Sequence, residues 1–222
     1  MSNFNADILE NLYRKTEVKI ISGTKYAPLR DEFSGNIEVD IDHSQILLTT
    51  GGADPYHMTC RMMKYFLADK ELQQYRLLVI LGKLNCDEEQ IRELELGNER
   101  IQVLKNVNNM AELMKKSYIA ISAGGSTVFE LCATKTPVVC FSFSDDQRIY
   151  TQELDKQGVL LYCGDARDQI DIVGNIAENV KKVMKDENVY KELQSNMSVI
   201  TDGQGAARIA KELIKMICIE VR

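Results

Sequence analysis

The chain has 222 residues, a net charge of −6 and 45% hydrophobic residues. These values are typical of a folded globular protein whose core is large enough for one α/β domain. No apolar run approaches the roughly 18 residues that span a bilayer, and no basic cluster is dense enough to attract nucleic acid. Because the first residues also lack the basic start of a secretory signal, we predict a cytoplasmic protein without a membrane span.

Cysteine and histidine are placed in ways that disfavour a metal site. The six cysteines are scattered without C-x-x-C spacing, and the two histidines, His43 and His57, have no second ligand at suitable spacing. Reduced, buried thiols are therefore expected instead of disulfides or zinc ligands. The sequence predicts no metal and no cofactor.

Short apolar runs alternate with segments of helical spacing from residue 45 onward. The predicted strands cover residues 45–50, 76–81, 101–104, 118–121, 138–141 and 158–162. Helices are predicted from Pro55 through Leu67, from Ser126, and over residues 87–96, 110–116, 145–156, 169–185, 187–197 and 205–219. Before residue 45 we expect a short helix over 6–14, a short strand over 18–21 and an irregular surface linker over 23–35.

This alternation predicts a doubly wound, Rossmann-like parallel sheet of about six strands with helices on both faces. In such sheets, ligands bind at the carboxyl ends of the strands. Two glycine pairs, Gly51-Gly52 and Gly124-Gly125, directly follow predicted strands. They therefore mark one edge of the sheet as a candidate site for a phosphate-containing ligand.

The stretch Ser117–Phe143 reads as strand, small-residue turn, helix and strand. The amides at such a helix start are unpaired and favour an anion, and Ser126 or Thr127 can cap the helix or donate a hydroxyl. Glu130 falls about one turn into the helix, where its carboxylate can accept hydrogen bonds from a ribose diol. Ordinary capping and dipole compensation explain the same residues without any ligand.

Several common nucleotide and hydrolase motifs are absent. The chain has no G-x-x-x-x-G-K-[ST] and neither glycine pair belongs to G-x-G-x-x-G, which disfavours a P-loop nucleotidase and a dinucleotide-dependent dehydrogenase. The GGSTV sequence lacks the second glycine of a nucleophile elbow. Asp54 and Asp146 can be paired as an acid and a base, but helix capping explains each more simply.

Taken together, the segments GTKYAPLRDEF, GGADP, SAGGSTVFELCATKTPVVCFSFSDDQ and DGQGAARIA resemble the carboxyl half of the UDP-sugar hydrolases of the pseudaminic-acid pathway. Relatives of those hydrolases include spore-coat polysaccharide proteins and the lipid II-forming N-acetylglucosaminyl transferase, all of the two-domain GT-B architecture. The resemblance implies residues 1–36 as a remnant of an amino-terminal domain plus linker, and 37–222 as the nucleotide-sugar-binding domain.

Carried onto this sequence, the resemblance implies a UDP-sugar site built from both glycine turns. Its residues are Gly51, Gly52 and Asp54 after the first strand, Asn106 and Val107 against uracil, Ser122, Ala123, Gly124, Gly125, Ser126 and Thr127 at the phosphates, Glu130 on the ribose, and Asp146 and Gln147 facing the sugar. The family often has Asn where this chain has Asp146, which leaves the identity of the sugar open.

In that family, a preceding domain supplies the catalytic histidine from a glycine-rich loop, whereas only 22 residues precede Gly23 here. The expected function is therefore the UDP-sugar-binding half of a hydrolase that releases UDP, inactive alone. The alternatives are a UDP-sugar-dependent glycosyltransferase domain of polysaccharide biosynthesis and a non-catalytic UDP-sugar-binding module. Expected partners are UDP or a UDP-sugar, together with a separate amino-terminal domain or a second copy of the chain.

Overall fold

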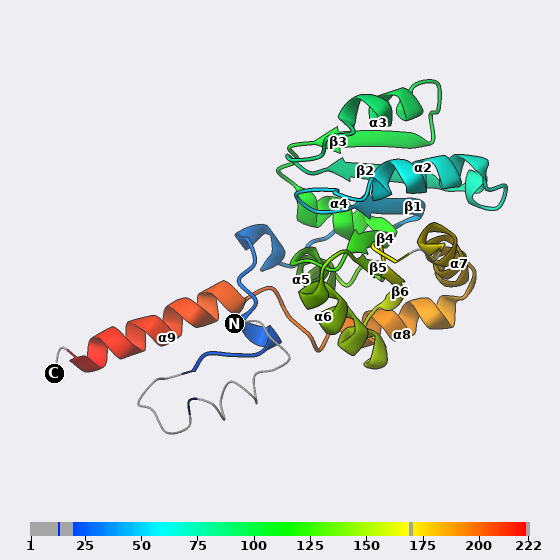
Figure 1. Cartoon of the computed structure of the whole chain (residues 1–222). Helices are drawn as coiled ribbons and strands as arrows, with labels where there is room; N and C mark the ends of the chain where they lie inside the picture. Colours follow the sequence, from blue (N-terminus) through cyan, green and yellow to red (C-terminus); the bar gives the residue numbers. More distant parts are fainter. Residues whose placement is uncertain (1–12, 14–19, 169–170, 221–222) are drawn as a thin grey trace.

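A six-stranded parallel sheet forms the centre of the molecule (Figure 1), with strand order β3-β2-β1-β4-β5-β6. The computed structural model describes residue 13, residues 20–168 and residues 171–220; most of the helix expected over 6–14 and of the strand expected over 18–21 lies outside these residues. The strands are β1 (Asp42–Thr49), β2 (Arg76–Leu81), β3 (Ile101–Lys105), β4 (Ser117–Ala123), β5 (Val138–Ser142) and β6 (Leu161–Asp165).

Helices cover both faces of this sheet, which confirms the predicted doubly wound fold. They are α2 (Met58–Ala68), α3 (Glu88–Glu95), α4 (Met110–Lys116), α5 (Thr127–Thr134), α6 (Asp145–Lys156), α7 (Ile172–Lys185), α8 (Glu187–Met197) and α9 (Gly205–Glu220). Successive residues of β1 point to opposite faces: Ile46 and Leu48 join the core beneath α2 and α7, whereas Leu47 joins the core beneath α4 and α5. Each face therefore has its own apolar core.

The last strand begins later than the sequence predicts. Residues 158–160 precede β6, which starts at Leu161. Gly158 has a φ of 66° and its amide donates to Asp155 O, so it closes the end of α6. Val159 and Leu160 are fully buried, but they pack into the core as a connection. The strand was predicted too early because a buried connection has the same run of apolar residues as a buried strand.

Helix α2 also begins later, at Met58 instead of Pro55. His57, directly before it, has a φ of 54°, and its amide donates to Asp54 O to form a turn. The Asp54 carboxylate reaches over this turn and accepts hydrogen bonds from the amides of Met58 (2.8 Å) and Thr59 (2.7 Å). Asp54 therefore caps α2 as predicted, although it lies four residues before the first residue of the helix.

Replacing Asp54 with alanine should lower the free energy of unfolding by about 1–2 kcal/mol, because two amides at a buried helix start lose their acceptor. Chemical denaturation followed by circular dichroism measures this change. Asp168→Ala is the matched control, since Asp168 is exposed, and it should change stability by less than about 0.5 kcal/mol. Equal stabilities for Asp54→Ala and the parent protein would contradict the capping role.

The segment expected to be a surface linker, residues 23–35, packs into the domain. It forms two 3₁₀ turns, η1 (Thr24–Tyr26) and η2 (Asp31–Phe33). Phe33 is 2% exposed, and Glu32 accepts a hydrogen bond from the Ala111 amide at the start of α4 (3.0 Å). A Cβ atom on Gly203, whose φ is 79°, would lie 1.9 Å from Phe33 O. This segment is thus held against α4 and the residues that precede α9.

Helix α9 leaves the body of the molecule beside this segment (Figure 1). At its start, Arg208 donates Nη1 to Lys25 O (3.0 Å), which joins α9 to η1. Farther along, Leu213 and Ile214 are at least half exposed. In the described part of the chain, no helix is both long and apolar enough to cross a membrane.

Candidate functional site

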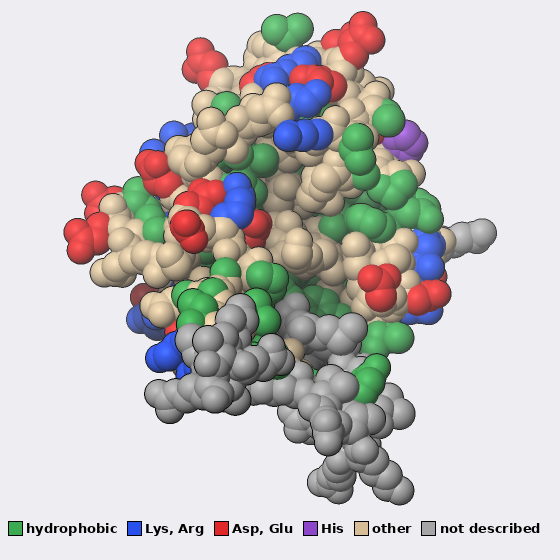
Figure 2. All heavy atoms as spheres, turned by 90° about the vertical axis from the view of Figure 1, so that its left-hand side faces the viewer, with side chains coloured by type: hydrophobic (Ala, Val, Ile, Leu, Met, Phe, Trp, Pro, Cys, Tyr) green, Lys and Arg blue, Asp and Glu red, His purple; other side chains and the backbone are tan. Residues whose placement is uncertain are grey.

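A cleft of about 250 Å³ opens at the carboxyl edge of the sheet. It lies where the loops after β1, β2 and β3 meet α5, across the point between β1 and β4 where the strand order reverses. Ligands bind at this point in doubly wound folds. Figure 2 looks onto this side of the molecule, where backbone and uncharged polar atoms are bordered by both Lys or Arg and Asp or Glu side chains. The lining residues are Arg30, Thr49, Gly51, Gly52, Ile80, Leu81, Gly82, Lys83, Asn106, Val107, Met110, Thr127 and Glu130.

The first glycine pair forms one wall of the cleft and is held in place by Gly82. Gly51 has a φ of 82°, a conformation that favours glycine. A Cβ atom on Gly82 would lie 2.0 Å from Gly51 O and 2.5 Å from Gly52 O, and the Leu84 amide donates to Gly52 O (2.9 Å). In a trans peptide the N–H opposes the C=O, so the amides of Gly52 and Ala53 point away from Gly82. Two neighbouring amides of this kind suit an anion.

Helix α5 forms the opposite wall. Thr127 and Glu130 are three residues apart, on one side of the helix, and both line the cleft. Ser126 stands at the N-cap position, yet its side chain makes no capping hydrogen bond. The predicted alternative of a Ser126 side-chain cap is therefore wrong in this structure, and its exposed hydroxyl remains available at the helix start.

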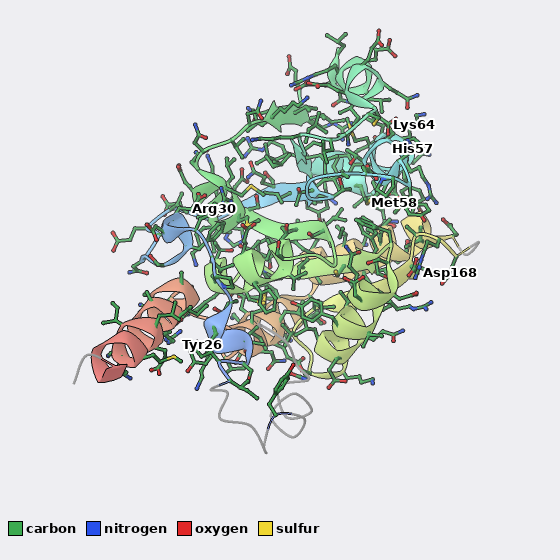
Figure 3. All side chains as sticks on the ribbon, turned by 60° about the vertical axis from the view of Figure 1, so that its left-hand side comes forward. Tyr26, Arg30, His57, Met58, Lys64 and Asp168 are labelled. Carbon is green, nitrogen blue, oxygen red and sulfur yellow. The ribbon has the colours of Figure 1, made fainter. Side chains whose placement is uncertain are left out.

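The Glu130 carboxylate faces an arginine that the sequence analysis did not select. Arg30 Nη2 lies 3.3 Å from Glu130 Oε1, Nη1 lies 2.7 Å from Glu32 Oε1, and the guanidinium stacks 5.2 Å from the centre of the Phe33 ring. Burial raises the pKa of the Glu130 carboxyl, and Arg30 acts in the opposite direction. Figure 3 shows Arg30 on the N-terminal segment. Arg30 and His57 lie on opposite sides of the sheet.

Six of the predicted site residues line this cleft. They are Gly51, Gly52, Asn106, Val107, Thr127 and Glu130. Asn106 has a φ of 56°, which turns the backbone sharply at the end of β3. Asparagine tolerates this conformation better than most residues. The structure thus brings together residues from two separate loops and one helix that the sequence placed at one edge.

The second glycine pair lies beside the cleft, not among its lining residues. The Gly124 amide donates to Phe141 O (2.7 Å), and a Cβ atom on Gly124 would lie 2.5 Å from the Thr151 methyl group. Gly125 is partly exposed and has open space at its Cβ position. Ser122 and Ala123, the residues before the pair, are buried in β4. Close packing thus explains Gly124, whereas Gly125 leaves room for a ligand.

Asp146 and Gln147 stand at the start of α6, next to that glycine pair. Asp146 Oδ1 accepts a hydrogen bond from Ser144 Oγ (2.6 Å), and this bond lowers the pKa of the Asp146 carboxyl. Gln147 Oε1 accepts from the Phe143 amide (3.1 Å). Both side chains therefore have local partners, and neither lines the cleft.

Sequence reasoning missed two cations of the cleft, Arg30 and Lys83. Arg30 lies in the segment GTKYAPLRDEF and Lys83 follows a predicted strand, but no local pattern indicated that both side chains would line one cleft. Among the described residues, no group of three or more His, Cys, Asp or Glu side chains could hold a metal ion. Within this part of the chain, positive charge in the cleft therefore comes from Arg30, Lys83 and helix or loop amides.

Two proteins resemble the chain in sequence. The uncharacterized protein MJ1062 of Methanocaldococcus jannaschii is 30% identical over 168 residues, covering 66% of this chain and 34% of that protein. The spore coat polysaccharide biosynthesis protein SpsG of Bacillus subtilis is 22% identical over 206 residues, covering 91% of this chain and 60% of SpsG. The chain thus spans about a third and three fifths of the lengths of these relatives.

The fold also resembles that of the pneumococcal O-GlcNAc transferase GtfA, solved in complex with UDP and GlcNAc. The TM-score is 0.60 at 14% identity, over 95% of this chain and 43% of GtfA. Residues 46–213, which include every strand after the start of β1 and most of the cleft, match the glycosyltransferase family 28 C-terminal domain. The chain therefore belongs to the family of glycosyltransferase family 28 C-terminal domains.

Proposed function

We propose that this chain binds the UDP part of a UDP-linked sugar, as the donor-binding half of a glycosyltransferase-like protein of polysaccharide biosynthesis. The observation that carries the proposal is the cleft itself, in which Glu130 on α5 faces the Gly51-Gly52 loop across the reversal of strand order. The family match, the name of SpsG and the UDP complex of GtfA support it.

Each part of the nucleotide has a matching group. The ribose hydroxyls would donate to the Glu130 carboxylate, and uracil would meet the backbone at Asn106 and Val107. The diphosphate would lie between the amides that follow Gly51 and the start of α5, where unpaired N–H groups and the helix dipole favour negative charge. The sugar would then extend toward Gly125 and the start of α6, where Asp146 and Gln147 lie.

Glycosyl transfer is better supported than the hydrolysis implied by the initial resemblance. The matching family is one of glycosyltransferase domains, and SpsG is named for polysaccharide biosynthesis. In either reaction the bond between the anomeric carbon and the phosphate oxygen breaks, and UDP leaves with the electron pair. Amides already oriented toward that oxygen would stabilise the charge that develops on UDP. For this chain, the consequence of the proposal that can be measured is the binding of UDP.

Calorimetric titration with UDP, UMP, uridine and GDP tests the proposal. We expect UDP to bind with a dissociation constant in the micromolar range, about −8 kcal/mol. GDP should bind at least about tenfold more weakly, because a purine does not match a subsite shaped by the turn at Asn106. Equal affinity for UDP and GDP would contradict the uracil assignment, and no binding of any of the four ligands would contradict the proposal as a whole.

A further inference from the structure

Lys83 lies two residues after the end of β2, lines the cleft and is exposed. Both of its neighbours are fixed on the first glycine pair: Gly82 packs against the carbonyl groups of Gly51 and Gly52, and the Leu84 amide donates to Gly52 O. The backbone of Lys83 is therefore anchored to the loop proposed to hold the diphosphate, and only its side chain is free to move.

The charges that line the cleft are balanced except at this lysine. Glu130 is paired with Arg30, and Arg30 is shared with Glu32 outside the cleft. Lys83 has no ion pair or hydrogen bond with any other described residue. An anion that enters the cleft thus meets one uncompensated cation among the described lining residues. The chain as a whole is acidic, with a net charge of −6, so its overall electrostatic field does not attract an anion in place of Lys83.

We propose that Lys83 binds the terminal phosphate of the nucleotide and makes the cleft selective for nucleoside diphosphates over monophosphates. This inference rests on the proposed function, since it assigns a residue to the diphosphate of the same ligand. A lysine suits this role because its ammonium group is a compact charge on a flexible stem, able to follow a phosphate that is itself mobile. Arg30, shared between two carboxylates, is held near the ribose instead.

Titration of four proteins with UDP, UMP and uridine tests the assignment. The proteins are the parent chain, Lys83→Gln, Lys83→Arg and the control Lys64→Gln, which removes an exposed lysine on α2 away from Arg30 (Figure 3). For Lys83→Gln we expect about a tenfold loss of UDP affinity, as for one charge-assisted phosphate contact, and less than about a twofold change for uridine. Lys83→Arg should keep most of the affinity for UDP, and Lys64→Gln should match the parent.

The outcomes separate this proposal from the one on which it rests. If the parent chain binds UDP and Lys83→Gln binds it equally well, the role of Lys83 is excluded while the UDP site stands. If Lys83→Gln loses UDP, UMP and uridine by the same factor, Lys83 supports the loop and does not select phosphates, so the proposal is again overturned. If the parent chain binds none of the three ligands, the UDP site itself is wrong, and the assignment of Lys83 is wrong with it.

Discussion

Replacing Glu130 with alanine should weaken UDP binding by about tenfold or more, or about 1.4 kcal/mol. The half-buried carboxylate is the acceptor on α5 that faces the cleft, and in the proposed complex it accepts hydrogen bonds from two ribose hydroxyls. Hydrogen bonds to a charged group contribute about 1.5–3 kcal/mol each after exchange with water, so the stated loss is a lower bound. Calorimetric titration of both proteins with UDP measures the change.

The same substitution also removes one of the two carboxylates paired with Arg30, so that Arg30 would attract the diphosphate more strongly and hide part of the loss. A second ligand, the 2′-deoxy form of UDP, separates the two effects. The parent chain should prefer UDP to the deoxy ligand, whereas Glu130→Ala should bind both alike. Glu89→Ala, which removes an exposed carboxylate on α3, serves as the control and should retain the preference. A preference that survives in Glu130→Ala would show that the ribose binds elsewhere.

Replacing Gly82 with alanine should abolish most of the affinity for UDP, with a loss beyond tenfold, and should lower the free energy of unfolding by about 1–3 kcal/mol. The new methyl group would overlap Gly51 O at 2.0 Å and Gly52 O at 2.5 Å. These are backbone atoms, so the loop itself must move, and its amides move with it. Titration with UDP and chemical denaturation measure the two effects.

Gly35→Ala is the matched control, because no atom beyond its two chain neighbours lies within 4 Å of the Cβ position at Gly35 and its φ is ordinary. This variant should bind UDP like the parent chain and unfold at nearly the same denaturant concentration. If Gly82→Ala also kept its full affinity for UDP, the diphosphate would not depend on the position of the Gly51-Gly52 loop. The anion site would then have to be sought at α5 alone.

The sheet could be predicted from the sequence because each strand of its centre contains a short apolar run. Strands such as β2 are covered on both faces and contain few polar residues, so burial and strand formation give the same pattern. At β6 these two properties separate: Val159 and Leu160 are buried but lie outside the strand. The predicted start of α2 at Pro55 was wrong for a related reason. Asp54 caps the helix across a turn, and the residue preferences at positions 54–57 did not predict that turn.

In the candidate site, too, some residues could be predicted from the local sequence and others depended on contacts between distant segments. Gly51, Asn106 and Glu130 follow strand ends or open a helix, so the topology alone gathers them at one edge. Arg30 lies 100 residues from Glu130 in the sequence, and only the packing of Phe33 and Glu32 brings it to the cleft. Local sequence patterns do not predict contacts between residues so far apart in the chain. The position of Arg30 beside Glu130 could therefore be found only from the structure.

The contact between the N-terminal segment and the start of α9 has a consequence for synthesis on the ribosome. The Lys25 carbonyl and the Arg208 guanidinium are separated by 183 positions in the chain. Domains begin to fold as they emerge, and long-range contacts form only when both partners are available. The sheet can thus assemble while residues 20–36 still lack their last anchors. The wall of the cleft that carries Arg30 becomes fully fixed only after the start of α9 has been made.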